Sequence, residues 1–289
     1  MVGARSVNVM NTTTKTTESE SDLHASQIAN LGPRREDEEL CEKPMREAVG
    51  SLLWVSGMTR PDIVSAVRAV ARQTHNPSSR HWKAVVKIIA YLKRTKDLGL
   101  LFVRGGSFVL SVYVDADYAS QSNWRRSVSG VAVILGGAVI NATSTTQHCV
   151  TLSTSEAEYV AITQGARMVL FTKAVLEFLQ PQISGRTVDV FEDNQGAIAL
   201  AENPMSAGRT KHIDVRYHFI RELVEKKVLR MVYRKTEEQP ADVLTKPLAR
   251  ESFERHRRFL MNCPCSCFVI AVCKCAYVMS SSICCSRRC

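Results

Sequence analysis

The sequence predicts an α/β protein in which a mixed five-stranded sheet is flanked by helices and preceded by a small helical unit. From residue 107 onward, strand-like and helical patterns follow one another in the order βββαβααβα. This order is typical of a mixed sheet with helices packed on it. With 289 residues, 45% of them hydrophobic, the chain can bury one substantial core and a smaller companion unit.

The small helical unit is expected between residues 46 and 96. The apolar segment EAVGSLLWVSGM predicts a first helix, and Pro61 favours the entry of a second, which ends at Asn76-Pro77. A third helix is predicted by apolar residues at three- and four-residue steps. These residues are Trp82, Val85, Ile89 and Leu92. After Gly99, the run LGLLFV predicts extended structure, with a turn at Gly105-Gly106.

Three antiparallel strands are expected next. The strand-like runs are FVLSVYV, SVSGVAVIL and AVINATSTT, and Gly136-Gly137 between the last two is a hairpin signal. The remaining elements alternate helices and strands. They are a long helix with a capping box at Ser153 and Glu156, the strand TVDVF, a short helix after Asn194, a helix from about His212 to Lys226, the strand VLRMVYR and a final helix from about Pro240.

The composition shifts along the chain predict four parts. Residues 1–43 are rich in Ser, Thr and charge and are expected to be a disordered leader. The helical segment covers 44–104 and the sheet domain covers 105–262. The tail, 263–289, holds eight of the ten cysteines; its C-x-C spacings could bind zinc, but a disordered extension is the preferred interpretation because no regular pair of C-x-x-C motifs occurs.

The charge of the chain favours a polyanionic partner. The formal net charge is +10 and the pI is about 9.2. Between Arg60 and Lys96, nine basic residues accompany a single acid, Asp62. Taken by itself, such a stretch is more often a solvated helix face. The first residues lack a signal peptide and no apolar run is long enough to cross a membrane, so a soluble protein of the cytoplasm or nucleus, without a membrane partner, is expected.

Four acidic islands carry the candidate chemistry. They are Asp115 in YVDADY, Glu158 in STSEAEYVA, Asp193 in VFEDNQGA and Asp242 in EEQPADVLTKPL. Cleavage of a phosphodiester needs a deprotonated water and a stabilised leaving oxygen, and two divalent ions roughly 3.5–4 Å apart supply both. Magnesium prefers carboxylate, phosphate and water oxygens. The four islands therefore predict a metal-dependent nuclease.

Neighbouring acids leave the choice of ligands open on spacing alone. Asp117, Glu156 and Glu192 each lie within two residues of a candidate. Asp117 shares a strand face with Asp115, whereas Glu192 and Asp193 should point to opposite faces, so that only one of them points inward. Acids in the first turns of helices also have an electrostatic reason to be there.

Eight segments resemble one known family. They are TRPDIVSAV, HWKAVVKIIAYLKRTKDLGLLF, YVDADYAS, RRSVSGVAVILGG, LSTSEAEYVAI, EDNQGAIALAENP, RTKHIDVRYHFIREL and EQPADVLTKPL. In this order, over roughly residues 45–260, they resemble the ribonuclease H domain at the C-terminal end of the Pol polyprotein of Ty1/copia-type LTR retrotransposons. The resemblance implies an RNase H-like fold and cleavage of the RNA strand of an RNA–DNA hybrid with two Mg²⁺ ions, with Mn²⁺ as a substitute.

The resemblance also assigns residues. Matched motif by motif, the catalytic and metal-binding carboxylates are Asp115, Glu158, Asp193 and Asp242, which selects among the rivals. Nucleic-acid contacts are expected from Ser155 and Gln195, at the minor groove where RNA exposes its 2′-hydroxyls, and from Arg209 and Lys211. Segment 44–104 resembles the family's thumb or connection region and is expected to grip the hybrid backbone.

Other features limit what the resemblance implies. The polymerase palm is missing, and in YVDAD the residue Ala116 separates the acids of a superficially polymerase-like motif, so reverse transcription is not expected. Asn141-Ala142-Thr143 stands where the family usually has a Trp-Lys pair, and His212 and His218 are the candidates for proton shuttling. The alternatives are a catalytically inactive remnant that only binds hybrids and an integrase-like DNA-cutting enzyme, which the motifs disfavour.

Overall fold

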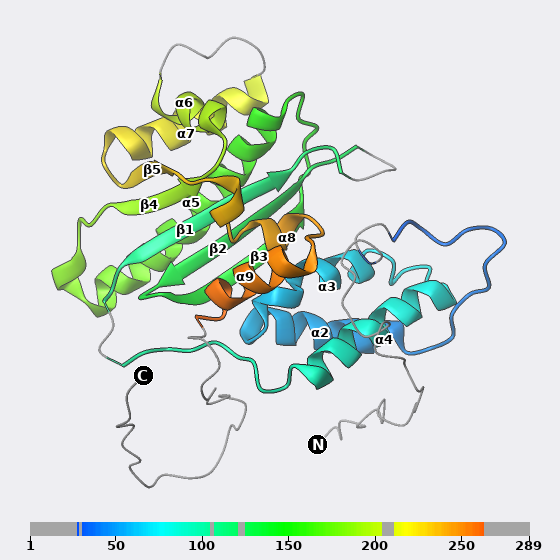
Figure 1. Cartoon of the computed structure of the whole chain (residues 1–289). Coiled ribbons are helices and arrows are strands. Elements are labelled where there is room, and N and C mark those ends of the chain that lie inside the picture. Colours follow the sequence, from blue (N-terminus) through cyan, green and yellow to red (C-terminus); the bar gives the residue numbers. More distant parts are fainter. Residues whose placement is uncertain (1–27, 29–30, 105–106, 121–124, 204–210, 263–289) are drawn as a thin grey trace, which may run out of the picture.

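The computed structural model describes residues 28, 31–104, 107–120, 125–203 and 211–262 (Figure 1). For residues 211–217 it describes the backbone and not the side chains. Its centre is a five-stranded sheet of order β3-β2-β1-β4-β5. The strands are β1 (Leu110–Asp117), β2 (Val128–Leu135), β3 (Ala138–Thr146), β4 (Val188–Glu192) and β5 (Leu229–Tyr233). The first three are antiparallel, while β4 and β5 run parallel to β1. The predicted mixed sheet flanked by helices is confirmed.

The hairpin between β2 and β3 forms as the glycine pair predicts. Gly136 and Gly137 have φ angles of +58° and +87°, and a two-residue turn of this kind needs positive φ at both positions. The expectation of extended structure for LGLLFV holds only in part. Residues 98–103 form no strand, and Leu101 instead donates its N–H to the carbonyl of Met261.

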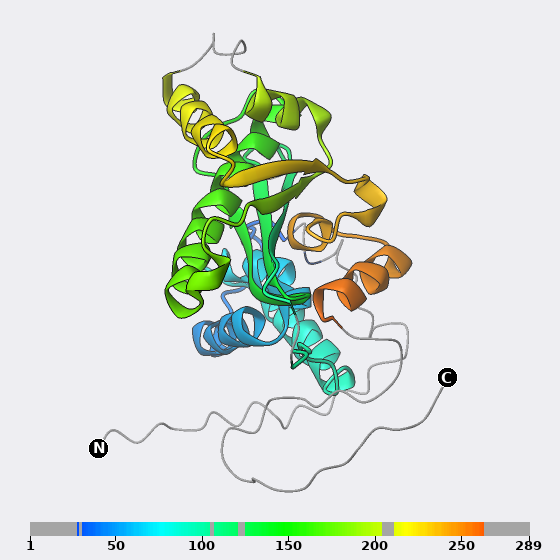
Figure 2. The ribbon, with the colours of Figure 1, turned by 90° about the vertical axis from the view of Figure 1, so that its left-hand side faces the viewer.

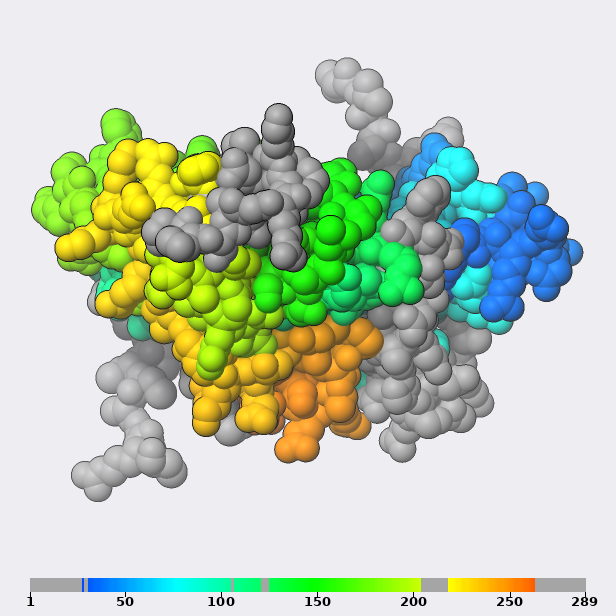
Figure 3. Space-filling model, turned by 90° about the horizontal axis from the view of Figure 1, so that it is seen from above, coloured from blue at the N-terminus to red at the C-terminus, as the bar shows by residue number. Residues whose placement is uncertain are grey.

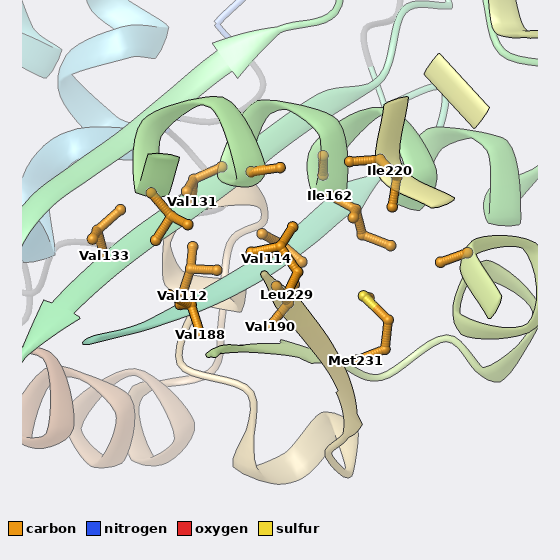
Figure 4. Close-up of a cluster of buried hydrophobic side chains, with 14 of the residues drawn as sticks. Val112, Val114, Val131, Val133, Ile162, Val188, Val190, Ile220, Leu229 and Met231 are labelled. Carbon is orange, nitrogen blue, oxygen red and sulfur yellow. The ribbon is translucent and has the colours of Figure 1, made fainter. Parts of the chain in front are cut away.

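One long helix covers the first face of the sheet. Helix α5 (Thr154–Leu179) begins after Ser153, whose side chain accepts a hydrogen bond from the N–H of Glu156. Valines of the central strands pack beneath it, as Figure 4 shows for Val112, Val114 and Val131. Gly165 allows the close approach, because a Cβ there would lie 2.6 Å from Val114 Cγ1. The helices α6 (Gln195–Glu202) and α7 (Lys211–Glu225) complete this side.

Two short helices cover the opposite face (Figure 2). The single final helix predicted from about Pro240 is wrong, because the segment divides into α8 (Asp242–Thr245) and α9 (Arg250–Leu260). Pro247 between them disfavours a helical conformation of the residue before it and cannot donate a backbone hydrogen bond. The break lets α8 contact β1 and β2 while α9 runs in another direction.

The N-terminal helical unit packs directly on the sheet domain. It comprises α2 (Met45–Met58), a 3₁₀ turn (Pro61–Ile63), α3 (Val64–Ala71) and α4 (Ser79–Arg94). Helices α2 and α3 contact β3, and α3 also contacts α8. Figure 3 shows this blue and cyan unit beside the green part of the sheet domain. Within the described part of the chain, no helix is long and apolar enough to cross a membrane.

The segment expected to be a disordered leader is partly folded. Residues 1–27 and 29–30 lie outside the described residues, but the part from 31 onward is packed against the helical unit. Leu31 is buried, Leu40 forms a β-bridge with Ser78, and Glu38 pairs with Arg80 at 2.8 Å. Residues 31–43 therefore depart from the expectation, because their few apolar and acidic side chains find partners on the helices. The cysteine-rich tail, 263–289, lies outside the described residues.

Candidate active site

Three of the predicted carboxylates meet at one edge of the sheet. One oxygen atom from each of Asp115, Glu158 and Asp193 lies within 4.8 Å of the corresponding atoms of the other two. Strand pairing explains the meeting of the two aspartates. The last pair of the parallel β1–β4 ladder is Tyr113 and Phe191. Asp115 and Asp193 each follow that pair by two residues, so both lie at the same edge of the sheet.

Glu158 reaches this edge from the helix above it. The residue lies in the second turn of α5, and its neighbours Ala157 and Ile162 are buried against the sheet. The glutamate is only 4% exposed and Asp115 only 1% exposed, while Asp193 is half-buried. Thr236 orients Asp193, since its hydroxyl donates to Asp193 Oδ2 at 2.6 Å. The cluster is therefore buried on the α5 side and open at Asp193.

The fourth carboxylate, Asp242, lies beside the cluster and is joined to it by a lysine. Lys246 Nζ lies 3.1 Å from Asp242 Oδ1 and 3.5 Å from Asp115 Oδ1. The hydroxyl of Thr245 donates a hydrogen bond to Asp115 Oδ2. Gly130 permits α8 to lie this close, because a Cβ at that position would be 2.7 Å from Thr245 Cγ2. Helix α8 thus carries Asp242 to the same strand that carries Asp115.

Burial and mutual repulsion strongly raise the pKa values of two of these acids, Glu158 and Asp242. Burial, then the charges of Glu192, Asp115 and Asp193, raise the pKa of Glu158 to about 12. Burial and the charge of Asp115 raise the pKa of Asp242 to about 8, although Lys246 works against this. Burial also disfavours the charge of Lys246, but Asp115 and Asp242 outweigh it and raise the pKa of its ammonium. The site carries more negative charge than its own residues neutralise.

The donor set fits a hard divalent cation. Glu158 Oε2 and Glu192 Oε2 are buried without a hydrogen-bond partner, an arrangement that costs free energy unless another group satisfies it. The oxygens of Asp115, Glu158 and Asp193 are close enough together to be shared by one ion. Carboxylate oxygens with open positions for water and phosphate are what Mg²⁺ prefers. Asp115, Glu158, Asp193 and Asp242 are the residues that could hold such ions.

This charge imbalance predicts how stability depends on pH and metal. Above pH ~4 an unfolded Asp242 is ionised, whereas the folded protein keeps its proton until about pH 8. The folded state binds more protons in this window, so stability falls as the pH rises from about 4 to about 8. We expect the melting temperature in EDTA to drop by at least ~3 °C between pH 5.5 and pH 8.

Millimolar Mg²⁺ should reverse most of that loss at pH 8, since a ligand that binds only the folded state stabilises it. Differential scanning calorimetry at both pH values, with and without Mg²⁺, measures the effect. The Asp242→Asn variant is the control and should show a shallower pH dependence in EDTA. Equal melting temperatures for the wild type at the two pH values would contradict the prediction.

The rival acids occupy different positions. Asp117 ends β1 and is outside the group of three oxygens, and Glu156 turns back so that its Oε2 accepts the N–H of Leu152 at 2.6 Å. The expectation that only one of Glu192 and Asp193 points inward is wrong. Glu192 is fully buried, and its charge is the largest electrostatic influence on Glu158. Asp193 lies beyond the strand end, where the alternation of strand faces no longer applies.

The predicted nucleic-acid contacts are only partly described. Ser155 lies beside the cluster at the start of α5 and donates to Asn194 Oδ1 at 3.2 Å, and Gln195 begins α6 with its side chain exposed. Arg209 lies outside the described residues, and Lys211 begins α7 with its side chain also outside them. Of the two histidine candidates, His218 is exposed on α7 and the side chain of His212 is not described.

Sequence reasoning missed Lys246 and Thr245. A signal for the lysine exists, because Asp242 and Lys246 are four residues apart and such a pair meets on one helical face. The hydroxyl of Thr245 gives no comparable signal. Its role depends on the close approach that Gly130 permits between α8 and β2, a contact between residues far apart in the sequence.

The sheet order, the carboxylates at the ends of β1 and β4 and the acid on the covering helix define a protein with the RNase H-like fold. The chain is 42% identical over 216 residues to the Pol polyprotein of transposon TNT 1-94 from Nicotiana tabacum, and 37% identical over 213 residues to that of transposon RE2 from Arabidopsis thaliana. Over 74% of its length, this chain is therefore homologous to Ty1/copia-type retrovirus-related Pol polyproteins, as its motifs predict.

The chain spans 16% of the TNT 1-94 polyprotein and 14% of the RE2 polyprotein. Among solved structures, LC11-RNase H1, isolated from compost, covers 51% of this chain with 97% of its own length, at a TM-score of 0.36 and 16% identity. No family model matches the chain.

Proposed function

We propose that this chain is the ribonuclease H part of a copia-type Pol polyprotein and that it hydrolyses the RNA strand of RNA–DNA hybrids with divalent metal. The observation that carries the proposal is the convergence of Asp115, Glu158 and Asp193 within 4.8 Å, with Asp242 beside them. Two Mg²⁺ ions, or Mn²⁺ in their place, are the proposed cofactors. The homology supports this assignment, and the motifs by which the chain resembles the family contain these four acids.

Each part of the site has a task in this reaction. When bound, the ions lower the pKa of the attacking water and neutralise the leaving oxygen. Asp115 and Glu158, which are buried and tightly placed, would hold ions in a rigid position. Asp193, which is half-buried, borders the more open side, where the phosphodiester would enter, and Asp242 is buried beside Asp115. Lys246, already paired with Asp115 and Asp242, supplies positive charge next to the scissile phosphate.

The substrate side of the proposal rests on the edge around Ser155 and Gln195. Both side chains lie at helix starts next to the cluster, where backbone N–H groups also favour anionic partners. Contacts from these residues to 2′-hydroxyls would distinguish the RNA strand from DNA. Arg209 and Lys211 are proposed to contact the same nucleic acid. The cytoplasmic particle of the parent element, or the nucleus, is the proposed location.

A cleavage assay tests the proposal. Purified protein is incubated with a hybrid labelled on the RNA strand and with Mg²⁺, beside the Asp193→Asn variant and a DNA duplex of the same sequence. We expect the wild type to cut only the RNA strand, and Asp193→Asn to cut at least ~100-fold more slowly, because one metal ligand is lost. Binding of the hybrid without cleavage by the wild type would instead identify a silent hybrid-binding remnant.

A further inference from the structure

One arginine of the helical unit, Arg68, lies half-buried, and the acid whose charge acts on it is Asp117 at the end of β1. Arg68 is on α3, and its Nε is buried and has no hydrogen-bond partner. The one hydrogen bond that its guanidinium makes within the described part of the chain is from Nη1 to Thr146 Oγ1, at 3.3 Å. Arginine is rarely buried unless it is paired, because removal of its charge from water is costly. Asp117 offsets part of this charge, but Arg68 Nε still has no hydrogen-bond partner and can accommodate an anionic ligand.

This guanidinium lies at the same end of the sheet as the carboxylates. Thr146 ends β3 and pairs with Val128, which in turn pairs with Asp117, the last residue of β1. Two strand spacings amount to ~10 Å, so Arg68 is anchored about that far from the β1 end that carries Asp115. Helix α3 also contacts α8, which carries Asp242. Figure 1 shows α3 beside β3 and α8.

A second arginine stands one helical turn further on. Arg72 follows Arg68 by four residues and is exposed, so both side chains project from one face of α3. Burial, and then the charge of Arg72, lower the pKa of Arg68, while the charge of Asp117 raises it. Two guanidinium groups on one face can bind phosphate oxygens through paired hydrogen bonds.

We propose that Arg68 and Arg72 bind the sugar-phosphate backbone of the RNA–DNA hybrid beside the cleavage site, so that the helical unit supplies part of the substrate-binding surface. This inference rests on the proposed function. It deepens it by naming residues outside the sheet domain that position the hybrid. Phosphate contacts fix register and affinity and carry no base information, so these residues should affect binding of every hybrid sequence equally.

The test measures hybrid affinity as a function of salt in the Asp193→Asn background and in EDTA, so that cleavage does not consume the hybrid during the titration. A fluorescent hybrid is titrated by anisotropy between 50 and 200 mM KCl with Arg68→Gln, Arg72→Gln and the double variant. Each lost phosphate contact should reduce the slope of log K against log salt by about 1, so the double variant should lose about 2. Arg68→Lys should bind with intermediate affinity because it keeps the charge and loses the paired geometry.

Arg46→Gln, which removes an equal charge from an exposed position at the start of α2, is the matched control and should keep the wild-type slope. In the active protein, Arg72→Gln should raise KM several-fold and leave kcat within about 2-fold. If Arg68→Gln fails to fold, the test rests on Arg72→Gln alone, because Arg72 is exposed and its replacement leaves the packing intact. Unchanged slope and KM for a folded Arg72→Gln variant overturn the inference while wild-type cleavage still stands. Absence of hybrid cleavage by the wild type overturns the proposed function itself.

Discussion

Replacement of Glu158 with glutamine is expected to abolish hybrid cleavage and to leave the metal-free protein at least as stable as the wild type. The carboxyl is buried, its Oε2 has no hydrogen-bond partner, and its pKa is raised to about 12 by burial and by Glu192, Asp115 and Asp193. Without metal the side chain is therefore protonated at neutral pH, and glutamine reproduces its shape and neutrality. The variant loses only the charge that metal binding requires.

The expected loss of cleavage is at least ~10³-fold, since a metal ligand contributes several kcal/mol to the stabilisation of the transition state. Cleavage is measured under single-turnover conditions with Mg²⁺, and stability is measured by urea denaturation in EDTA at pH 8. Isothermal titration with Mn²⁺ should show weaker binding than in the wild type. These three measurements separate a lost ligand from a damaged fold.

Glu156→Gln is the matched control, because it makes the same chemical change two residues away on the same helix. Glu156 is partly exposed, and its carboxylate accepts only the N–H of Leu152 among the described hydrogen bonds. We expect this variant to cleave within ~3-fold of the wild type, as changes at surface positions usually have small effects. Full activity of Glu158→Gln, or an equal loss of activity in Glu156→Gln, would show that Glu158 is not a specific metal ligand of the site.

The parts of the fold that the sequence predicts well are those with local signals. Gly136-Gly137 marks the hairpin, Ser153 marks the start of α5, and the alternation of apolar residues marks the strands, because each signal depends on residues close together in the chain. The final helix shows the limit of this reasoning. Its apolar pattern continues past Lys246, but Pro247 divides it, and contacts with β1 and β2 orient the first piece.

The candidate site is predictable in its main acids and not in its surroundings. The motif order gives Asp115, Glu158 and Asp193, and the structure brings these three together. Lys246 and Glu192 are harder to assign to the site from the sequence. Lys246 follows the last residue of α8 and Glu192 is the last residue of β4, so their positions depend on the conformation at the ends of these two elements. Arg68 is harder still. Its relation to the site depends on the packing of α3 against β3, which brings together residues 78 positions apart.

The second large effect is expected at Asp62, where a buried polar network joins the helical unit to α9. The side chain of Asp62 is fully buried and pairs with Arg60, with Nη2–Oδ2 at 2.8 Å and Nε–Oδ1 at 2.9 Å. Tyr91 donates its hydroxyl to Asp62 Oδ2 at 2.6 Å, and Arg257 of α9 donates to that hydroxyl at 3.0 Å. The network thus runs from the helical unit into the C-terminal helix.

Asp62→Ala is expected to destabilise the protein by ~3–5 kcal/mol, because it leaves the buried charge of Arg60 without its partner. Urea denaturation measures the change in the free energy of unfolding. Two signals monitor it: tryptophan fluorescence, to which Trp54 and Trp82 of the helical unit contribute, and circular dichroism of the whole chain. Glu47→Ala, at an exposed acid of α2, should change stability by less than ~0.5 kcal/mol.

Because the network and the apolar contacts around Phe253 reach both the helical unit and α9, we expect the two signals to shift together in Asp62→Ala. Coincident transitions indicate one cooperative unit. A fluorescence transition that moves to lower urea while the main dichroism transition of the whole chain stays in place would show that the helical unit unfolds separately. In that case Arg68 would be held near the carboxylates by a loosely attached segment, and its contribution to hybrid binding would fall with temperature well before the sheet domain melts.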